Sequence, residues 1–134
     1  MYKTKNRVRM HDVDLADRLY FPRQFRFVHE ALEDFMETEG LPFNVVFQEE
    51  KFLFVIVHCE SDYLAILEMG DLIDINVYVE KIGTTSFTLH YDIFKEDGTK
   101  AGMAKTVHVA LNKATGTKIP IPEKLKAILN KHLL

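Results

Sequence analysis

One amphipathic stretch, residues 22–39, constrains the fold more than any other feature of the chain. Its apolar side chains recur at spacings of three and four, at Phe25, Val28, Leu32, Phe35 and Met36. Its acidic side chains fill the opposite side, at Glu30, Glu33, Asp34 and Glu37. This period predicts a long helix with one buried face. Pro22 suits the first turn, and Gly40 suits the left-handed position just past the end.

The remaining segments mostly have the period of β-strands. Residues 2–10 alternate loosely, residues 52–59 form a dense apolar run, and clear alternation follows in residues 73–80, 86–93 and 106–111. Turns are indicated around Gly83 and at Asp97-Gly98, the second being a strong hairpin signal. Residues 60–71 look irregular. A short helix is expected in residues 43–50 and a proline-bounded helix in residues 118–134.

This order predicts an α+β fold, in which about five antiparallel strands form a sheet and the long helix packs its apolar face against that sheet. The acidic face of the helix should remain in contact with water. A chain of 134 residues suits a single domain, residues 1–134, with one core.

Charge and composition exclude several classes of function. The net charge of −3 gives no broad footprint for nucleic acid, and the basic residues of the first strand are expected on its solvated face, at Lys3, Lys5, Arg7 and Arg9. No apolar run is long enough to span a bilayer. Cys59 is the only cysteine, so no intrachain disulfide forms, and a cytoplasmic location is expected. A buried thiol is favoured over a nucleophile for Cys59.

The segment "HDVDLADRLYFP", residues 11–22, places three carboxylates in front of the predicted helix: Asp12, Asp14 and Asp17. Spacing alone favours capping and turn chemistry, because aspartate offers a side-chain acceptor to nearby amides. His11 with two aspartates suggests a metal site, and Asp12-x-Asp14 resembles part of a calcium loop, but further ligands do not follow. No metal is therefore predicted.

Three segments, "VRMHDVDLADRLYFPRQF", "GDLIDINVYVEKIGTTSF" and "KIPIPEKLKAIL", together resemble the hot-dog-fold acyl-CoA thioesterases of the 4-hydroxybenzoyl-CoA thioesterase family. The resemblance spans nearly the whole chain. It implies a sheet wrapped around a central helix, and hydrolysis of an acyl-CoA to the free acid and CoA without a cofactor. It also implies a homodimer or homotetramer with its active site at a subunit interface.

The resemblance assigns roles to individual residues. Asp14 takes the position of the catalytic aspartate, as base or nucleophile, and the backbone N–H of Phe21 takes that of the oxyanion donor. Tyr20 and His29 are expected to contact the substrate, although a half-buried helix histidine with a local hydrogen bond is the simpler interpretation of His29. Asp17 stands where the family usually has glycine, and aspartate tolerates the left-handed conformation better than most residues.

Other interpretations remain open. A hot-dog dehydratase would use a histidine–carboxylate pair, and a non-catalytic acyl-CoA-binding or regulatory protein is the alternative from another class. The "GTT" at Gly83 to Thr85 lacks the basic residues that some relatives place near the CoA phosphates. Three strand histidines, His58, His90 and His108, are expected at the surface or on a sheet face.

Overall fold

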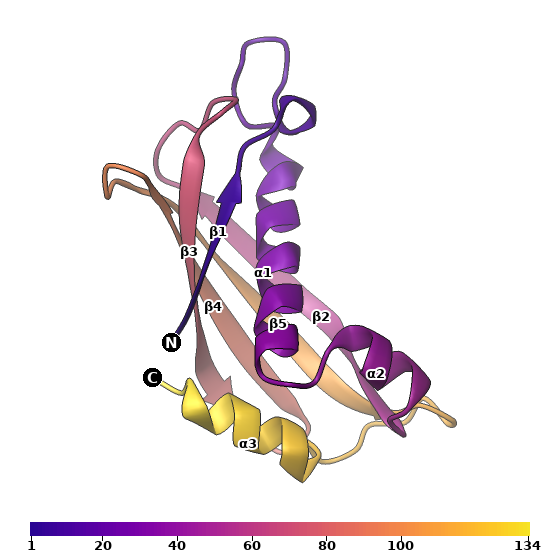
Figure 1. Cartoon of the computed structure of the whole chain (residues 1–134). Helices are drawn as coiled ribbons and strands as arrows, with labels where there is room; N and C mark the ends of the chain where they lie inside the picture. Colours follow the sequence, from indigo (N-terminus) through magenta and orange to yellow (C-terminus); the bar gives the residue numbers. More distant parts are fainter.

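A five-stranded antiparallel sheet carries the long helix α1 across one of its faces (Figure 1). The computed structural model describes all residues, 1–134. The elements are β1 (Tyr2–Arg7), η1 (Met10–Asp12), η2 (Phe21–Arg23), α1 (Gln24–Thr38), α2 (Phe43–Gln48), β2 (Phe52–Tyr63), β3 (Leu72–Ile82), β4 (Ser86–Lys95), β5 (Lys100–Asn112) and α3 (Glu123–Lys131). The predicted α+β class, the long helix and the sheet of five strands are thereby confirmed.

The strands lie in the order β1-β3-β4-β5-β2, so β1 and β2 are the two edges of the sheet. Every neighbouring pair is antiparallel. In β2 a bulge between Ile56 and His58 shifts the register against β5. Such a bulge bends an edge strand and adds twist. β2 therefore has one paired side and one side with no partner in the chain.

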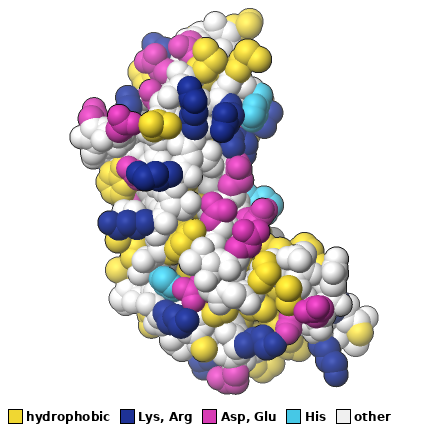
Figure 2. Space-filling model, in the orientation of Figure 1, with side chains coloured by type: hydrophobic (Ala, Val, Ile, Leu, Met, Phe, Trp, Pro, Cys, Tyr) yellow, Lys and Arg dark blue, Asp and Glu magenta, His cyan; other side chains and the backbone are white.

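The core lies between α1 and the sheet. Phe27 and Phe35 of α1 are almost completely buried, as are Ile75 of β3 and Tyr91 of β4. The apolar stripe of α1 is wider than predicted, because Phe27 and Ala31 join it while Phe25 is only half-buried. The acidic side chains remain on the outer side of α1, where Figure 2 shows a band of acidic groups above hydrophobic side chains gathered over α2.

The predicted helix end and hairpin are confirmed by two glycines in the left-handed region. Gly40 has φ 83° just after α1, and Gly98 has φ 89° in the turn between β4 and β5. A side chain with a Cβ atom is strained at such angles, whereas glycine is not. The basic residues of β1 alternate outward as expected, since Lys3, Lys5 and Arg7 are exposed.

Two strands are longer than the sequence indicated. β2 continues through Tyr63, because an edge strand exposed on both faces needs no alternation and is held by backbone pairing with β5. β5 begins at Lys100, where Gly102 faces the Gln24 side chain so closely that a Cβ would lie 2.8 Å from the Gln24 amide.

Cys59 is exposed on β2, so the prediction of a buried thiol is wrong. None of the helices has the length and apolar content needed to cross a bilayer.

Candidate active site

The loop between β1 and α1 separates its three carboxylates into one buried group and two exposed groups. Asp12 is completely buried. Its Oδ1 accepts a hydrogen bond from Arg26 Nε at 2.7 Å, and its Oδ2 accepts from the Arg9 backbone N–H at 2.8 Å and from a second nitrogen of Arg26. Burial alone would raise the pKa of Asp12, but these donors outweigh it and hold that pKa below its usual range. Asp12 therefore has a structural role. It accepts a backbone N–H, as the capping interpretation predicted, and it also forms an ion pair with Arg26, which the sequence did not indicate.

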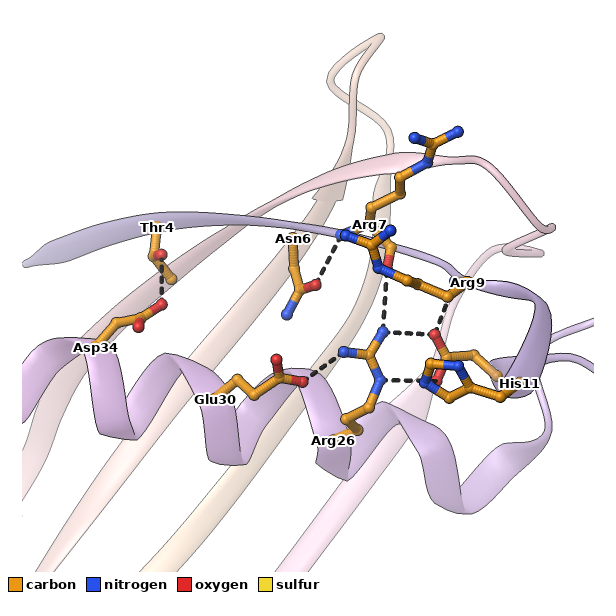
Figure 3. Close-up of polar contacts among 9 residues, drawn as sticks. Thr4, Asn6, Arg7, Arg9, His11, Arg26, Glu30 and Asp34 are labelled. Carbon is orange, nitrogen blue, oxygen red and sulfur yellow. Dashed lines mark hydrogen bonds and ion pairs between the residues drawn. The ribbon is translucent and has the colours of Figure 1, made fainter. Parts of the chain in front are cut away.

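Arg26 fixes the loop against both β1 and α1. Its guanidinium also donates to the backbone oxygen of Arg7 at 3.0 Å and pairs with Glu30 one turn further along α1 (Figure 3). Because only 19% of the Arg26 side chain is exposed, these bonds are partly shielded from water. The start of the loop is consequently held at a fixed place relative to the helix.

Asp14 is exposed and shapes the next turn through one oxygen only. Its Oδ1 accepts the backbone N–H groups of Ala16 at 2.9 Å and Arg18 at 3.3 Å. Its other oxygen, Oδ2, accepts no hydrogen bond from the chain. The turn thus orients the carboxylate while one oxygen remains free for a water molecule or a substrate.

Asp17 adopts the left-handed conformation that its glycine-like position predicted, with φ 56°. It is the only residue other than glycine with a positive φ, and such a conformation is costly for most side chains. Its Oδ1 accepts the backbone N–H of Met69 at 3.1 Å, which ties the tip of the loop to the segment before β3. Arg18 donates to the backbone oxygens of Ala16 and Asp17 rather than to a carboxylate.

Phe21 starts the 3-10 turn η2 that leads into α1. At this start the Arg23 N–H donates to the Tyr20 oxygen, and Pro22 has no N–H. The Phe21 N–H has no acceptor in the chain. Its carbonyl accepts the hydroxyl of Tyr63 at 2.6 Å, which anchors this peptide to β2. The Phe21 amide is therefore an available donor at the positive end of a helix.

An apolar groove of about 400 Å³ lies between α1, α2, β2 and β5. We call it the aromatic groove, and its walls include His29, Phe43, Phe47, Phe54, Ile56 and His108. A larger hollow of about 470 Å³ between β1 and the β4–β5 turn is lined almost entirely by polar and charged side chains. Small-molecule sites are typically apolar with a few polar groups, so the aromatic groove is the better candidate for an acyl group.

The structure places the four predicted site residues in two areas. Asp14, Tyr20 and Phe21 share the β1–α1 loop, where the Tyr20 and Phe21 rings pack edge to face at 5.5 Å. His29 lies on the second turn of α1, exposed and without a hydrogen bond, so the half-buried alternative is wrong. Their chemical roles stay predictions. The sequence analysis did not predict that α2 and β2 form walls of the groove, or that His108 lines it.

His108 and His90 are both buried, with 1% and 6% of their surfaces exposed, whereas His58 is exposed. For His108, burial and the nearby His29 lower its pKa to about 4. The imidazole of His108 is therefore neutral near pH 7, because burial in apolar surroundings disfavours its charged form.

Comparison with known proteins shows the family. Residues 8–129 match the thioesterase-like superfamily. A 1,4-dihydroxy-2-naphthoyl-CoA hydrolase from Prochlorococcus marinus (strain NATL1A) is 30% identical, over 92% of this chain and 87% of its own. A protein of the same name from Rippkaea orientalis is 31% identical, over 88% and 87% of the two chains. The crystal structure of a 1,4-dihydroxy-2-naphthoyl-CoA thioesterase from Synechocystis superposes with a TM-score of 0.89 at 24% identity, covering 96% of this chain and 95% of that one.

The chain belongs to the thioesterase-like superfamily of hot-dog proteins. The family resemblance seen in the sequence is thereby confirmed, together with the predicted class of enzyme, a thioester hydrolase.

Proposed function

We propose that this protein is an acyl-CoA thioesterase whose substrate carries a hydroxylated aromatic acyl group of the naphthoyl type. Two groups of the β1–α1 loop carry the proposal. The Phe21 amide lacks an acceptor at the start of a helix, and the Asp14 carboxylate has one oxygen that accepts no hydrogen bond from the chain. The aromatic walls of the groove and the names of the relatives support the choice of acyl group.

In the proposed reaction Asp14 acts as general base toward water or as the nucleophile itself. Attack on the thioester carbonyl places a negative charge on its oxygen, and the Phe21 N–H donates a hydrogen bond to that oxyanion. The carbon–sulfur bond then breaks, and CoA leaves as its thiol after protonation. Water supplies the oxygen of the free acid and the two protons that balance the products.

A panel of acyl-CoA thioesters, assayed for release of free thiol, tests the activity directly. The panel should contain 1,4-dihydroxy-2-naphthoyl, benzoyl and short aliphatic thioesters, and we expect turnover of the first to be fastest. Absence of thiol release from every thioester would instead support the alternative of a non-catalytic acyl-CoA-binding protein.

Asp14→Asn tests the role of the carboxylate. The amide keeps the turn acceptor but removes the base and nucleophile, so kcat should fall by about two to four orders of magnitude. Asp17→Asn is the matched control, because asparagine also tolerates a positive φ and still accepts the Met69 N–H. Equal losses in both variants, or none in Asp14→Asn, would show that the chemistry lies elsewhere.

We also propose that the protein assembles through the open edge of β2 into a homodimer or a homotetramer. Val55, Ile56 and Val57 are 38%, 47% and 58% exposed on this strand, and an exposed apolar edge tends to pair with another chain. Light scattering should give at least a dimer at micromolar concentration. An active monomer would contradict the proposal.

A further inference from the structure

One N–H group stays free at the start of the long helix, and its direction is set by its own peptide. The N–H groups of Tyr20, Arg23 and Gln24 have acceptors, Pro22 has no N–H, and only the N–H of Phe21 is left. The peptide that carries this N–H includes the Tyr20 carbonyl oxygen, which accepts the Arg23 N–H at 2.8 Å. Since the C=O and N–H of a trans peptide point in opposite directions, the Phe21 N–H points away from the helix.

The carbonyl of Phe21 is held from a distant strand. It accepts the Gln24 backbone N–H and, at 2.6 Å, the hydroxyl of Tyr63, which is the last residue of β2. Tyr63 pairs with Gly102 of β5, so its hydroxyl comes from the sheet and not from a loop. This hydrogen bond is exposed, and water satisfies an exposed carbonyl about as well. What the Tyr63 hydroxyl adds is therefore the position of the peptide.

A second contact ties the same turn to β2 through a buried amide. The Gln24 side chain is 1% exposed, and its Nε2 donates to Ser61 Oγ and, at 3.0 Å, to the Asp62 carbonyl oxygen. β5 makes room for this amide with Gly102, where a Cβ would lie 2.8 Å from both Nε2 and Oε1 of Gln24. Three consecutive residues at the end of β2 thus hold the start of the helix.

The buried amide is unfavourable for folding in one respect. Oε1 of Gln24 is buried and accepts no hydrogen bond in the chain, and a buried polar atom without a partner lowers stability. A methionine has a similar length and would fill the space without such an atom. Natural sequences break packing rules of this kind mainly at functional sites. The amide is therefore explained by the turn that it holds rather than by stability.

We propose that Tyr63 and Gln24 are positioning residues, which hold the Phe21 N–H at the place where it meets the oxygen of the thioester. This inference rests on the proposed acyl-CoA thioesterase function and adds how its oxyanion donor is held. A donor stabilises the developing charge only from hydrogen-bond distance, and small displacements are costly. Loss of either contact should consequently lower kcat and leave KM nearly unchanged.

Tyr63→Phe removes one hydroxyl and keeps the ring. We expect kcat to fall by roughly 5- to 50-fold, which is less than the loss of the donor itself, while KM changes by less than about twofold. Gln24→Met removes the side-chain donor at similar length and should act in the same direction. The matched control is Tyr2→Phe, which removes a hydroxyl bonded to Thr38 at the far end of α1 and should change neither parameter.

The Phe21→Pro variant separates positioning from direct contact with the substrate. Without the N–H there is no donor left to position, so adding Tyr63→Phe should lower kcat no further. A full additional loss in the double variant would show that Tyr63 acts on the substrate by another route, and would overturn the inference.

Backbone dynamics provide a readout without turnover. In the wild type, the ¹⁵N order parameter of Phe21 should be that of a rigid backbone, about 0.85, and it should fall towards about 0.6 in Tyr63→Phe and Gln24→Met but not in Tyr2→Phe. Unchanged order parameters in both variants, or unchanged kcat in an active enzyme, overturn the inference and leave the proposed function standing. A wild type that hydrolyses no thioester contradicts the proposed function, and the order parameters then still decide whether the two residues hold the amide.

Discussion

The β1–α1 loop and the aromatic groove are built from contacts of different range. In the loop, Asp14 is oriented by amides two and four residues away, and the Phe21 amide is left free by its own neighbours in sequence. The groove instead joins α1, α2, β2 and β5, and residues such as His29 and His108 meet there from distant parts of the chain. Under the proposed function, the loop would set the reaction rate and the groove would set which acyl group is used.

Phe21→Pro should have the largest effect and should act on all thioesters alike. Proline removes the N–H but suits the first position of a helix, and the ψ of 120° at Tyr20 is compatible with a following proline. We expect kcat to fall by about 100- to 1,000-fold, the usual effect of losing one oxyanion donor. Steady-state kinetics with one aromatic and one aliphatic thioester measures this loss.

The control for this change is Phe21→Tyr, which keeps the backbone donor and should keep most activity. Circular dichroism should show a native fold for both variants. A folded Phe21→Pro variant with normal turnover would assign the oxyanion to another donor and would weaken the distinction between loop and groove.

The same difference in range explains what could be predicted from the sequence. The helix and its glycine end were predictable, because each depends on a period or on one residue's backbone preference, although Pro22 lies in the 3-10 turn before α1 and not in its first turn. Asp17 was marked as unusual by the family resemblance, because the family usually has glycine at this position, and the structure confirms its left-handed conformation. The carboxylate loop before the helix was visible as a local pattern.

Features made by distant segments were not predictable. Asp12 and Asp14 look alike in sequence, and only the approach of Arg26 makes one of them buried and paired. The start of β5 brings Gly102 against the Gln24 side chain of α1, and the burial of His108 involves Phe54 and Phe87 from two other strands. Neither period nor spacing carries information of this kind.

Asp12→Asn should have the second-largest effect, and it probes the buried ion pair that holds the start of the loop. Breaking a buried ion pair costs about 3–5 kcal/mol, and we expect about 2–3 kcal/mol here because Arg26 is 19% exposed and retains Glu30. Chemical denaturation measures this loss. Asp74→Asn, which breaks the exposed pair with Lys5, is the control and should change stability far less.

The pH dependence of stability provides a second measurement on the same variant. The pKa of Asp12 is lower in the folded protein than in the unfolded chain, where aspartate has a pKa of about 3.9. Its contribution is therefore complete above that value and is lost as the pH falls through the lower folded pKa. The wild type should lose stability more steeply than Asp12→Asn below about pH 4. Parallel curves would mean that the pair does not support the loop.

Phe47→Ala should have the smallest effect and should be confined to the groove. The Phe47 ring is 61% exposed and contacts Phe43 at a centroid distance of 5.8 Å, so its loss should hardly change the free energy of unfolding. A bound aromatic acyl group would lose one ring contact, worth about 0.5–1.5 kcal/mol or roughly 2- to 10-fold in KM. KM for a short aliphatic thioester and kcat for both substrates should stay nearly constant. A fall in kcat shared by both substrates would show that the groove and the loop act together, because α1 carries His29 within the groove and begins directly after the Phe21 turn.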